Sequence, residues 1–161
     1  EAGDAAGMQA VRMDEIVFQT AAQLSKFYPD FKLNFEIDDS SSKPMTMEVM
    51  GEEMLLRIAL QNLMKNAYAY SDNQLVRCTI GEEAGRLQLT ITNSGQVPIV
   101  ADTSQLFQAF ARGSNSAGTQ GSGIGLSIVR RILHHHRATI QYQIPDERTN
   151  RIVLQFPTAK V

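Results

Sequence analysis

Residues 119–133 read TQGSGIGLSIVRRIL, in which glycine occupies every second position from 121 to 125 before an aliphatic pattern begins. Glycine lets the backbone approach another group closely, because it carries no side chain. The apolar residues that follow recur at helical spacing, and they are Leu126, Ile128, Val129, Ile132 and Leu133. The stretch therefore predicts a glycine-rich loop that leads into a helix N-terminus. Such a terminus offers unpaired N–H groups and partial positive charge, which suit a phosphate.

Two common phosphate-binding motifs do not match this stretch. A Walker loop requires Gly-Lys-Ser/Thr, and no lysine follows any of these glycines. A Rossmann fingerprint requires a strand directly before it and a sixth-position glycine, but RGSNSAGTQ precedes and Leu126 takes that position. A different phosphate site, or a merely flexible connection, remains open at this point.

The composition of the chain restricts its class. With 161 residues, 43% hydrophobic and 20% charged, the chain is long enough for one globular core. Its net charge of -2 lacks the basic surplus of a nucleic-acid binder, so we expect no nucleic-acid partner. Cys78 is the single cysteine, which excludes an internal disulfide and favours a buried small residue in a reducing, cytosolic setting.

Periodicity divides the chain into helices and strands. Helical patterns cover 14–28, with Asp14 as the expected N-cap, and 51–70, where Leu56, Leu60, Leu63 and Ala67 form an apolar stripe. Alternating segments predict strands at 31–37 and 44–50, taken as a hairpin, at 75–81 and 86–93, and at 139–144 and 151–156. The long segment 94–120 is rich in Gly, Ser and Asn, and we expect a mobile lid there.

These elements predict an α/β fold of two layers. A mixed, mostly antiparallel sheet would be covered on one face by about three helices. Asn62, Asn66 and Tyr70 lie one turn apart on the longest helix, beside its apolar stripe, so they either line a cleft or form a solvated face.

Four motifs together resemble one known family, the catalytic ATP-binding domain of sensor histidine kinases, which shares the Bergerat fold with gyrase-type ATPases. NLMKNAYAY is similar to its N box, NSG at a strand end to its G1 box, LFQAFARG to its F box, and GSGIGLSIV to its G2 box. The resemblance covers roughly residues 10–157. It implies a domain at 10–161 with a lid at about 95–120, preceded at 1–9 by a linker remnant from an upstream helical hairpin.

The resemblance also implies the cofactors ATP and Mg²⁺. Asn62 and Asn66 would offer amide oxygens to Mg²⁺, a hard cation that takes oxygen ligands. The hydrolytic relatives carry a glutamate at the position of Asn62, and an amide cannot take a proton at neutral pH, so Asn62 favours transfer over hydrolysis. Arg112 would reach the terminal phosphate, and Lys65 is a second candidate because the family's usual lysine is replaced by Ala69.

Base and phosphate contacts follow from the same resemblance. Asn93 stands where the family usually has the aspartate that accepts from the adenine amino group, and its uncharged carbonyl should bind more weakly. The remaining expected nucleotide-binding positions are Tyr70, Gly95, Ile99, Phe110, Gly121, Gly123, Gly125 and Leu126.

The implied function is transfer of the ATP γ-phosphoryl group to a histidine on a separate dimerisation domain. A response regulator would act downstream, and the fragment itself would be a monomeric cytoplasmic domain of a parent anchored in the plasma membrane. His134 to His136 are expected to form an exposed helix end and no metal site. Two alternatives stay open: a nucleotide-sensing or partner-binding module without catalysis, and a serine kinase of the anti-sigma-factor type.

Overall fold

A computed structural model describes residues 7–38, 46–97 and 122–157, and the side chains of the last range from 127 onward. Its elements, in chain order, are β1 (Gln9–Arg12), α2 (Met13–Phe27), β2 (Lys32–Ile37), β3 (Glu48–Gly51), α3 (Glu53–Tyr70), β4 (Leu75–Glu83), β5 (Arg86–Ser94), α5 (Ser122–His135), β6 (Thr139–Asp146) and β7 (Thr149–Pro157).

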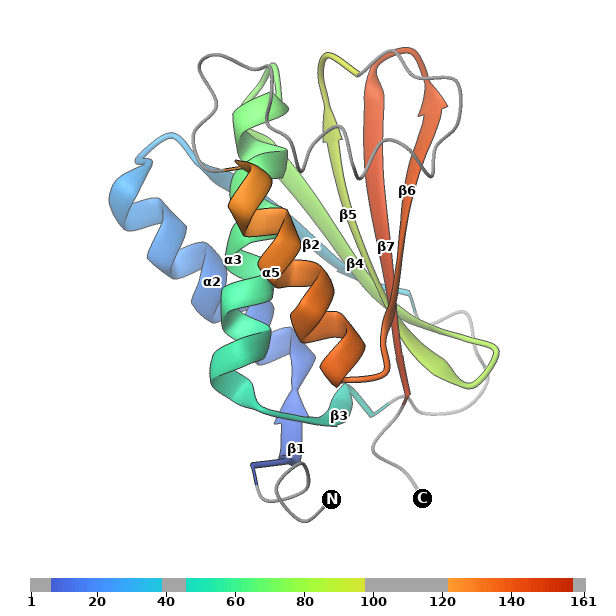
Figure 1. Cartoon of the computed structure of the whole chain (residues 1–161). Helices are drawn as coiled ribbons and strands as arrows, with labels where there is room; N and C mark the ends of the chain where they lie inside the picture. Colours follow the sequence, from blue (N-terminus) through green and yellow to red (C-terminus); the bar gives the residue numbers. More distant parts are fainter. Residues whose placement is uncertain (1–6, 39–45, 98–121, 158–161) are drawn as a thin grey trace.

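The described elements form two layers, as the periodicity predicts (Figure 1). A 5-stranded sheet has the order β2-β4-β5-β7-β6, with β2 parallel to β4 and the other neighbours antiparallel. The helices α2, α3 and α5 lie on one face of this sheet. The predicted fold class is therefore confirmed.

The core lies between the two layers. The predicted stripe of α3 is buried, from Leu56 through Leu60 and Leu63 to Ala67. Alternate residues of β4, β5 and β7 face it, because only one face of the sheet is covered by helices. Cys78 is fully buried in β4, and burial raises the pKa of its thiol to about 12, which fits the expected inert residue.

The predicted hairpin of 31–37 and 44–50 is wrong. β2 joins the main sheet in parallel with β4, where Phe35 packs on Phe18 of α2 with ring centroids 4.7 Å apart. β3 instead pairs with β1 in a separate 2-stranded sheet that buries Val11 opposite Val49. The strand β1 was not predicted, because four residues with a single buried side chain give no periodic signal.

The expected N-cap of α2 is also wrong. Arg12 holds the cap position in extended conformation, and α2 begins at Met13, whose N–H donates to the carbonyl of Met47 at 2.7 Å. Strand pairing therefore sets the start of the helix. Asp14 lies in the first turn and forms an ion pair with Arg12 at 2.7 Å.

Candidate functional site

The C-terminal end of α3 is tied to the end of β5 and to the turn between β6 and β7. The N–H of Asp72 donates to the carbonyl of Ser94 at 2.9 Å, and the N–H of Gly95 donates to that of Arg148 at 2.8 Å. Ser71 and Gly95 form an isolated antiparallel bridge. Three parts of the chain that are far apart in sequence thus meet at one end of the molecule (Figure 1).

Gly95 occupies the tightest point of this junction. A Cβ at this position would lie 2.0 Å from the carbonyl oxygen of Tyr70, which is inside van der Waals contact. Only glycine fits, because the backbone of α3 takes the space of a side chain. The predicted site residues Tyr70 and Gly95 are thus in direct contact.

The predicted polar face of α3 is present. Asn62, Asn66 and Tyr70 are half-buried, whereas Lys65 is exposed. The Nδ2 group of Asn62 donates to the carbonyl of Ile58 at 2.9 Å, which fixes the amide on the helix. Its Oδ1 is therefore the atom that can act as an acceptor or a metal ligand.

The glycine-led helix α5 runs antiparallel to α3. The backbone N–H of Glu52, at the start of α3, donates to Nε2 of His136, just after the end of α5, at 3.0 Å. The first turn of α5 consequently lies toward the C-terminal half of α3 (Figure 1). Gly123 and Gly125 fall inside this first turn, so the helix begins earlier than the predicted loop implied. The expected exposed helix end is wrong for His136, which is 4% exposed because it links the two helices, whereas His134 is exposed.

Asn93 is the last helix-facing residue of β5, following Leu87, Leu89 and Ile91 in the buried alternation. It is 5% exposed, and within the described part of the chain its Nδ2 has no hydrogen-bond partner. A buried amide donor without an acceptor is costly, roughly 1–3 kcal/mol. A bound group that accepts from this nitrogen would remove that cost.

The neighbour of Asn93 across the β5–β7 ladder is Asn150, whose amide is hydrogen-bonded at both its oxygen and its nitrogen. Its Oδ1 accepts from the hydroxyl of Tyr142 at 2.8 Å, and its Nδ2 donates to the carbonyl of Gln96 at 3.0 Å. Burial, with a smaller contribution from Tyr70, raises the pKa of Tyr142, so its phenol stays a donor. Asn150 and Tyr142 were not predicted as part of the site. A single asparagine within an alternating strand pattern does not indicate that its side chain lies at a binding site.

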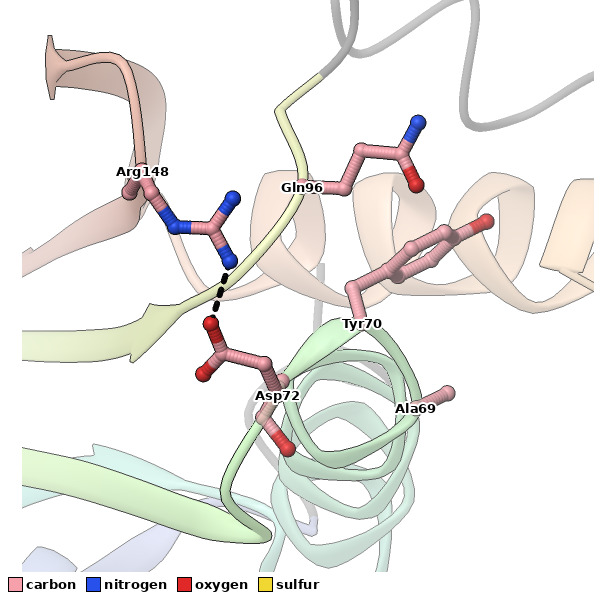
Figure 2. A pocket seen from close by; sticks show the side chains of 6 residues that line it. Ala69, Tyr70, Asp72, Gln96 and Arg148 are labelled. Atoms are coloured by element: carbon pink, nitrogen blue, oxygen red, sulfur yellow. Dashed lines mark hydrogen bonds and ion pairs between the residues drawn. The ribbon is translucent and has the colours of Figure 1, made fainter.

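An open pocket of about 520 Å³ lies at the same end of the molecule. Its walls are Ala69, Tyr70, Ser71, Asp72, Gln96 and Arg148. Figure 2 shows the Tyr70 ring and the Gln96 side chain pointing to the same side, away from the ion pair between Asp72 and Arg148. Tyr70 is the predicted site residue that lines the pocket. The sequence did not predict Asp72, Gln96 or Arg148, because they lie just after α3, just after β5 and in the turn between β6 and β7, where no periodic pattern marks them.

Four predicted site residues lie outside the described residues: Ile99, Phe110, Arg112 and Gly121. The predicted lid at 95–120 falls there too, except for its first residues. Gly123, Gly125 and Leu126 are placed in α5 by their backbone alone. Across the described residues, no group of three or more His, Cys, Asp or Glu side chains could hold a metal, and no helix is long and apolar enough to span a membrane.

Comparison with known protein families identifies the family of this domain. The family model of the histidine kinase-, DNA gyrase B- and HSP90-like ATPases matches residues 51–160. This chain belongs to that ATPase family. ATP is therefore the nucleotide expected of it, and the predicted family is confirmed.

The relatives of this ATPase domain are sensor kinases. It is 36% identical over 135 residues to the probable sensor protein PcoS of Escherichia coli, covering 78% of the chain and 28% of that protein. It is 33% identical over 111 residues to the sensor-like histidine kinase SenX3 of Mycobacterium tuberculosis, covering 67% of the chain and 27% of that protein. The domain thus spans less than a third of the length of either relative.

Solved structures agree on the fold. The catalytic domain of histidine kinase ThkA gives a TM-score of 0.72 at 19% identity, covering 94% of this chain and 95% of that one. The mycobacterial sensor histidine kinase MprB gives 0.72 at 20% identity, covering 93% and 97%. At this identity the likeness confirms the architecture of the ATPase domain and nothing finer.

Proposed function

We propose that this chain is the ATP-binding catalytic domain of a two-component sensor histidine kinase. It would transfer the γ-phosphoryl group of ATP to a histidine on a separate domain of its parent. Residues 10–161 would form the kinase domain, with 1–9 as a linker from a helical hairpin. The sensor-kinase relatives favour this reading over a serine kinase or a non-catalytic module.

The proposal rests on the convergence of three features in a member of the ATPase family. The half-buried amide face of α3, the end of β5 with the unpartnered Nδ2 of Asn93, and the glycine-led start of α5 all lie toward one end of the domain. Each supplies a group that a nucleotide triphosphate requires: oxygen ligands for its cation, a polar contact for its base, and backbone N–H groups for its phosphates.

The residues present fit a magnesium ion carried by the nucleotide. Asn62 keeps Oδ1 available because its nitrogen is engaged with Ile58, and Asn66 lies one turn further on. These two amides would hold Mg²⁺ together with phosphate oxygens. When bound, the ion neutralises phosphate charge and orients the terminal phosphoryl group.

The phosphates would meet the backbone around Gly121, Gly123 and Gly125. The first N–H groups of α5 have no intrahelical acceptor, so they are free to bind anions. Leu126 would close this side of the site. The guanidinium of Arg112 would stabilise charge on the terminal phosphate, and Lys65, which is exposed on α3, is a second cation for it.

The base would lie between Tyr70 and Ile99, with Phe110 on the lid side and Asn93 as its polar contact. Gly95 keeps Tyr70 against the end of β5. Asn62 cannot act as a general base, because an amide does not accept a proton at neutral pH. Water therefore receives no activation from this residue, which favours transfer to an acceptor histidine.

The partners follow from the same proposal. A dimerisation and phosphoacceptor domain of the parent would supply the histidine, and a response regulator would then take the phosphoryl group. The domain would work in the cytoplasm, on a parent held in the plasma membrane. Its net charge of -2 gives no support to nucleic acid as a partner.

The test is calorimetric titration of the domain with a non-hydrolysable ATP analogue, with and without Mg²⁺. We expect micromolar to sub-millimolar binding that weakens about tenfold or more without Mg²⁺ and in Asn66→Ala. Asn34→Ala, an exposed asparagine on β2, is the control and should bind like wild type. An absence of heat at millimolar analogue, or equal binding by Asn66→Ala, contradicts the proposal.

A further inference from the structure

The buried amide of Asn93 lies at the end of β5, where the proposed function places the polar contact of the base. Resting on that proposed function and deepening it, we propose that this amide lets the site take 6-oxopurine nucleoside triphosphates as well as ATP. The purine 6-position carries either an amino group, which donates a hydrogen bond, or an oxo group, which accepts one.

The geometry leaves the Nδ2 group of Asn93 uncommitted. The side chain lies at 5% exposure on the helix-facing side of β5, and among the described residues its Nδ2 finds no acceptor. Its ladder partner Asn150 does not serve, because that amide is oriented by its hydrogen bonds with Tyr142 and Gln96 and leaves the Asn93 nitrogen unpaired. A ligand atom is therefore the natural partner for the Asn93 nitrogen.

The location of Asn93 ties it to the nucleotide site. Two residues on, Gly95 contacts the backbone of Tyr70. At this edge of the sheet, where β5 ends and β7 begins, the inward position of each strand is an asparagine, whereas the other buried positions of both strands are apolar, so the polarity changes abruptly at the end of the core nearest the site. Such a change, with one donor unsatisfied, is typical of a ligand contact.

The chemistry of an amide differs from that of a carboxylate at this position. A carboxylate only accepts hydrogen bonds, so it favours a 6-amino group and repels a 6-oxo group. An amide carries one acceptor and one donor face, and a half-turn of its side chain exchanges them. Asn93 can thus pair Oδ1 with a 6-amino group or Nδ2 with a 6-oxo group.

The experiment compares ATP, ITP and GTP as competitors of a fluorescent ATP analogue, with Mg²⁺ present. ITP differs from ATP at the 6-position and the adjoining ring nitrogen, and GTP adds a 2-amino group. Wild type should bind ATP and ITP within about tenfold of each other. Asn93→Asp should shift the ratio toward ATP by roughly 10- to 100-fold, since a charged acceptor replaces the amide.

A matched control separates the added charge from the base contact. Asn34→Asp adds the same charge on the exposed strand β2 and should leave the ATP/ITP ratio unchanged. Thermal melting of each variant verifies folding, and should Asn93→Asp fail to fold, the wild-type ratio decides alone. Rejection of ITP by more than 100-fold in wild type, or an unchanged ratio in folded Asn93→Asp, overturns the inference while ATP binding upholds the proposed function. Binding of none of the three nucleotides overturns both.

Discussion

A side chain on Gly95 would overlap the carbonyl oxygen of Tyr70, since its Cβ would lie 2.0 Å from that atom. This contact fixes the end of α3 against the end of β5. The backbone around it is committed too, because Gly95 donates to the carbonyl of Arg148 and Asp72 donates to that of Ser94. The close approach therefore holds together the three segments that frame the candidate site.

Gly95→Ala should consequently damage both stability and binding. The α3 backbone must move to admit the methyl group, and we expect a loss of about 3 kcal/mol in the free energy of unfolding. Because the movement displaces Tyr70, nucleotide affinity should also fall. Urea denaturation and nucleotide titration measure the two effects.

Gly7→Ala is the matched control for this substitution. Its added Cβ would come 3.1 Å from the carboxyl group of Glu52, a side-chain end that needs to shift by only a few tenths of an ångström and can do so while it stays paired with His135. We expect a change within about 0.5 kcal/mol. A Gly95→Ala domain as stable as Gly7→Ala would show that the contact with Tyr70 is not needed.

His136 should make stability depend on pH. Its Nδ1–H donates to the carbonyl of Ile132 at 2.8 Å, and its Nε2 accepts from the backbone N–H of Glu52. The neutral ring therefore forms both hydrogen bonds. Burial, with a contribution from His135, lowers the pKa of His136 below 6.5 in the folded protein. The unfolded chain therefore binds the proton first as the pH falls.

The sign of the effect follows from this order. Stability is full above pH 6.5 and declines below it, by up to about 1.4 kcal/mol per pH unit, until the folded pKa is reached. Chemical denaturation at pH 7.5 and 5.5 measures the decline, which should shrink in His136→Gln. His134→Gln, on an exposed ring, should retain it. A decline of equal size in both variants would place the titrating group elsewhere.

The turn between β4 and β5 offers a stabilising substitution. Ala84 and Gly85 both have positive φ, of 55° and 78°, as a two-residue hairpin turn of type I′ requires. Asparagine tolerates this conformation better than alanine does. Ala84→Asn should therefore raise the free energy of unfolding by roughly 0.5–1 kcal/mol, measured by urea denaturation.

Ala84→Val provides the opposite test at the same exposed position. A β-branched side chain disfavours positive φ strongly, so this variant should be less stable than wild type. If the asparagine and valine variants shift stability in the same direction, the turn conformation does not govern the effect.

Elements with a long periodic pattern could be predicted from the sequence. The helix α3 shows an apolar stripe at helical spacing from Leu56 to Ala67, and this stripe is buried as expected. The strands β5 and β7 alternate over 9 residues each, and β4 alternates from Leu75 to Ile80, which specifies the inward face. The polar face of α3 could be read for the same reason, since Asn62, Asn66 and Tyr70 follow from helical geometry alone.

Pairing between segments could not be predicted in the same way. The turn-rich stretch after β2 suggested a hairpin, but β2 pairs with β4 and packs Phe35 on Phe18, whereas β3 pairs with β1 and buries Val49 opposite Val11. Such contacts are distant in sequence and leave no local pattern. The amide pair of Asn93 and Asn150 is similar, since only the register of β5 on β7 brings the two together.

Transfer of the γ-phosphoryl group to a histidine is tested most directly by one labelling experiment. The domain would be incubated with γ-labelled ATP, Mg²⁺ and the phosphoacceptor domain of its parent chain. The proposal predicts label on the acceptor that is lost in acid, retained in alkali, and absent when the acceptor histidine is replaced by glutamine. Release of free phosphate with no labelled acceptor, or label that survives acid, would contradict a histidine kinase.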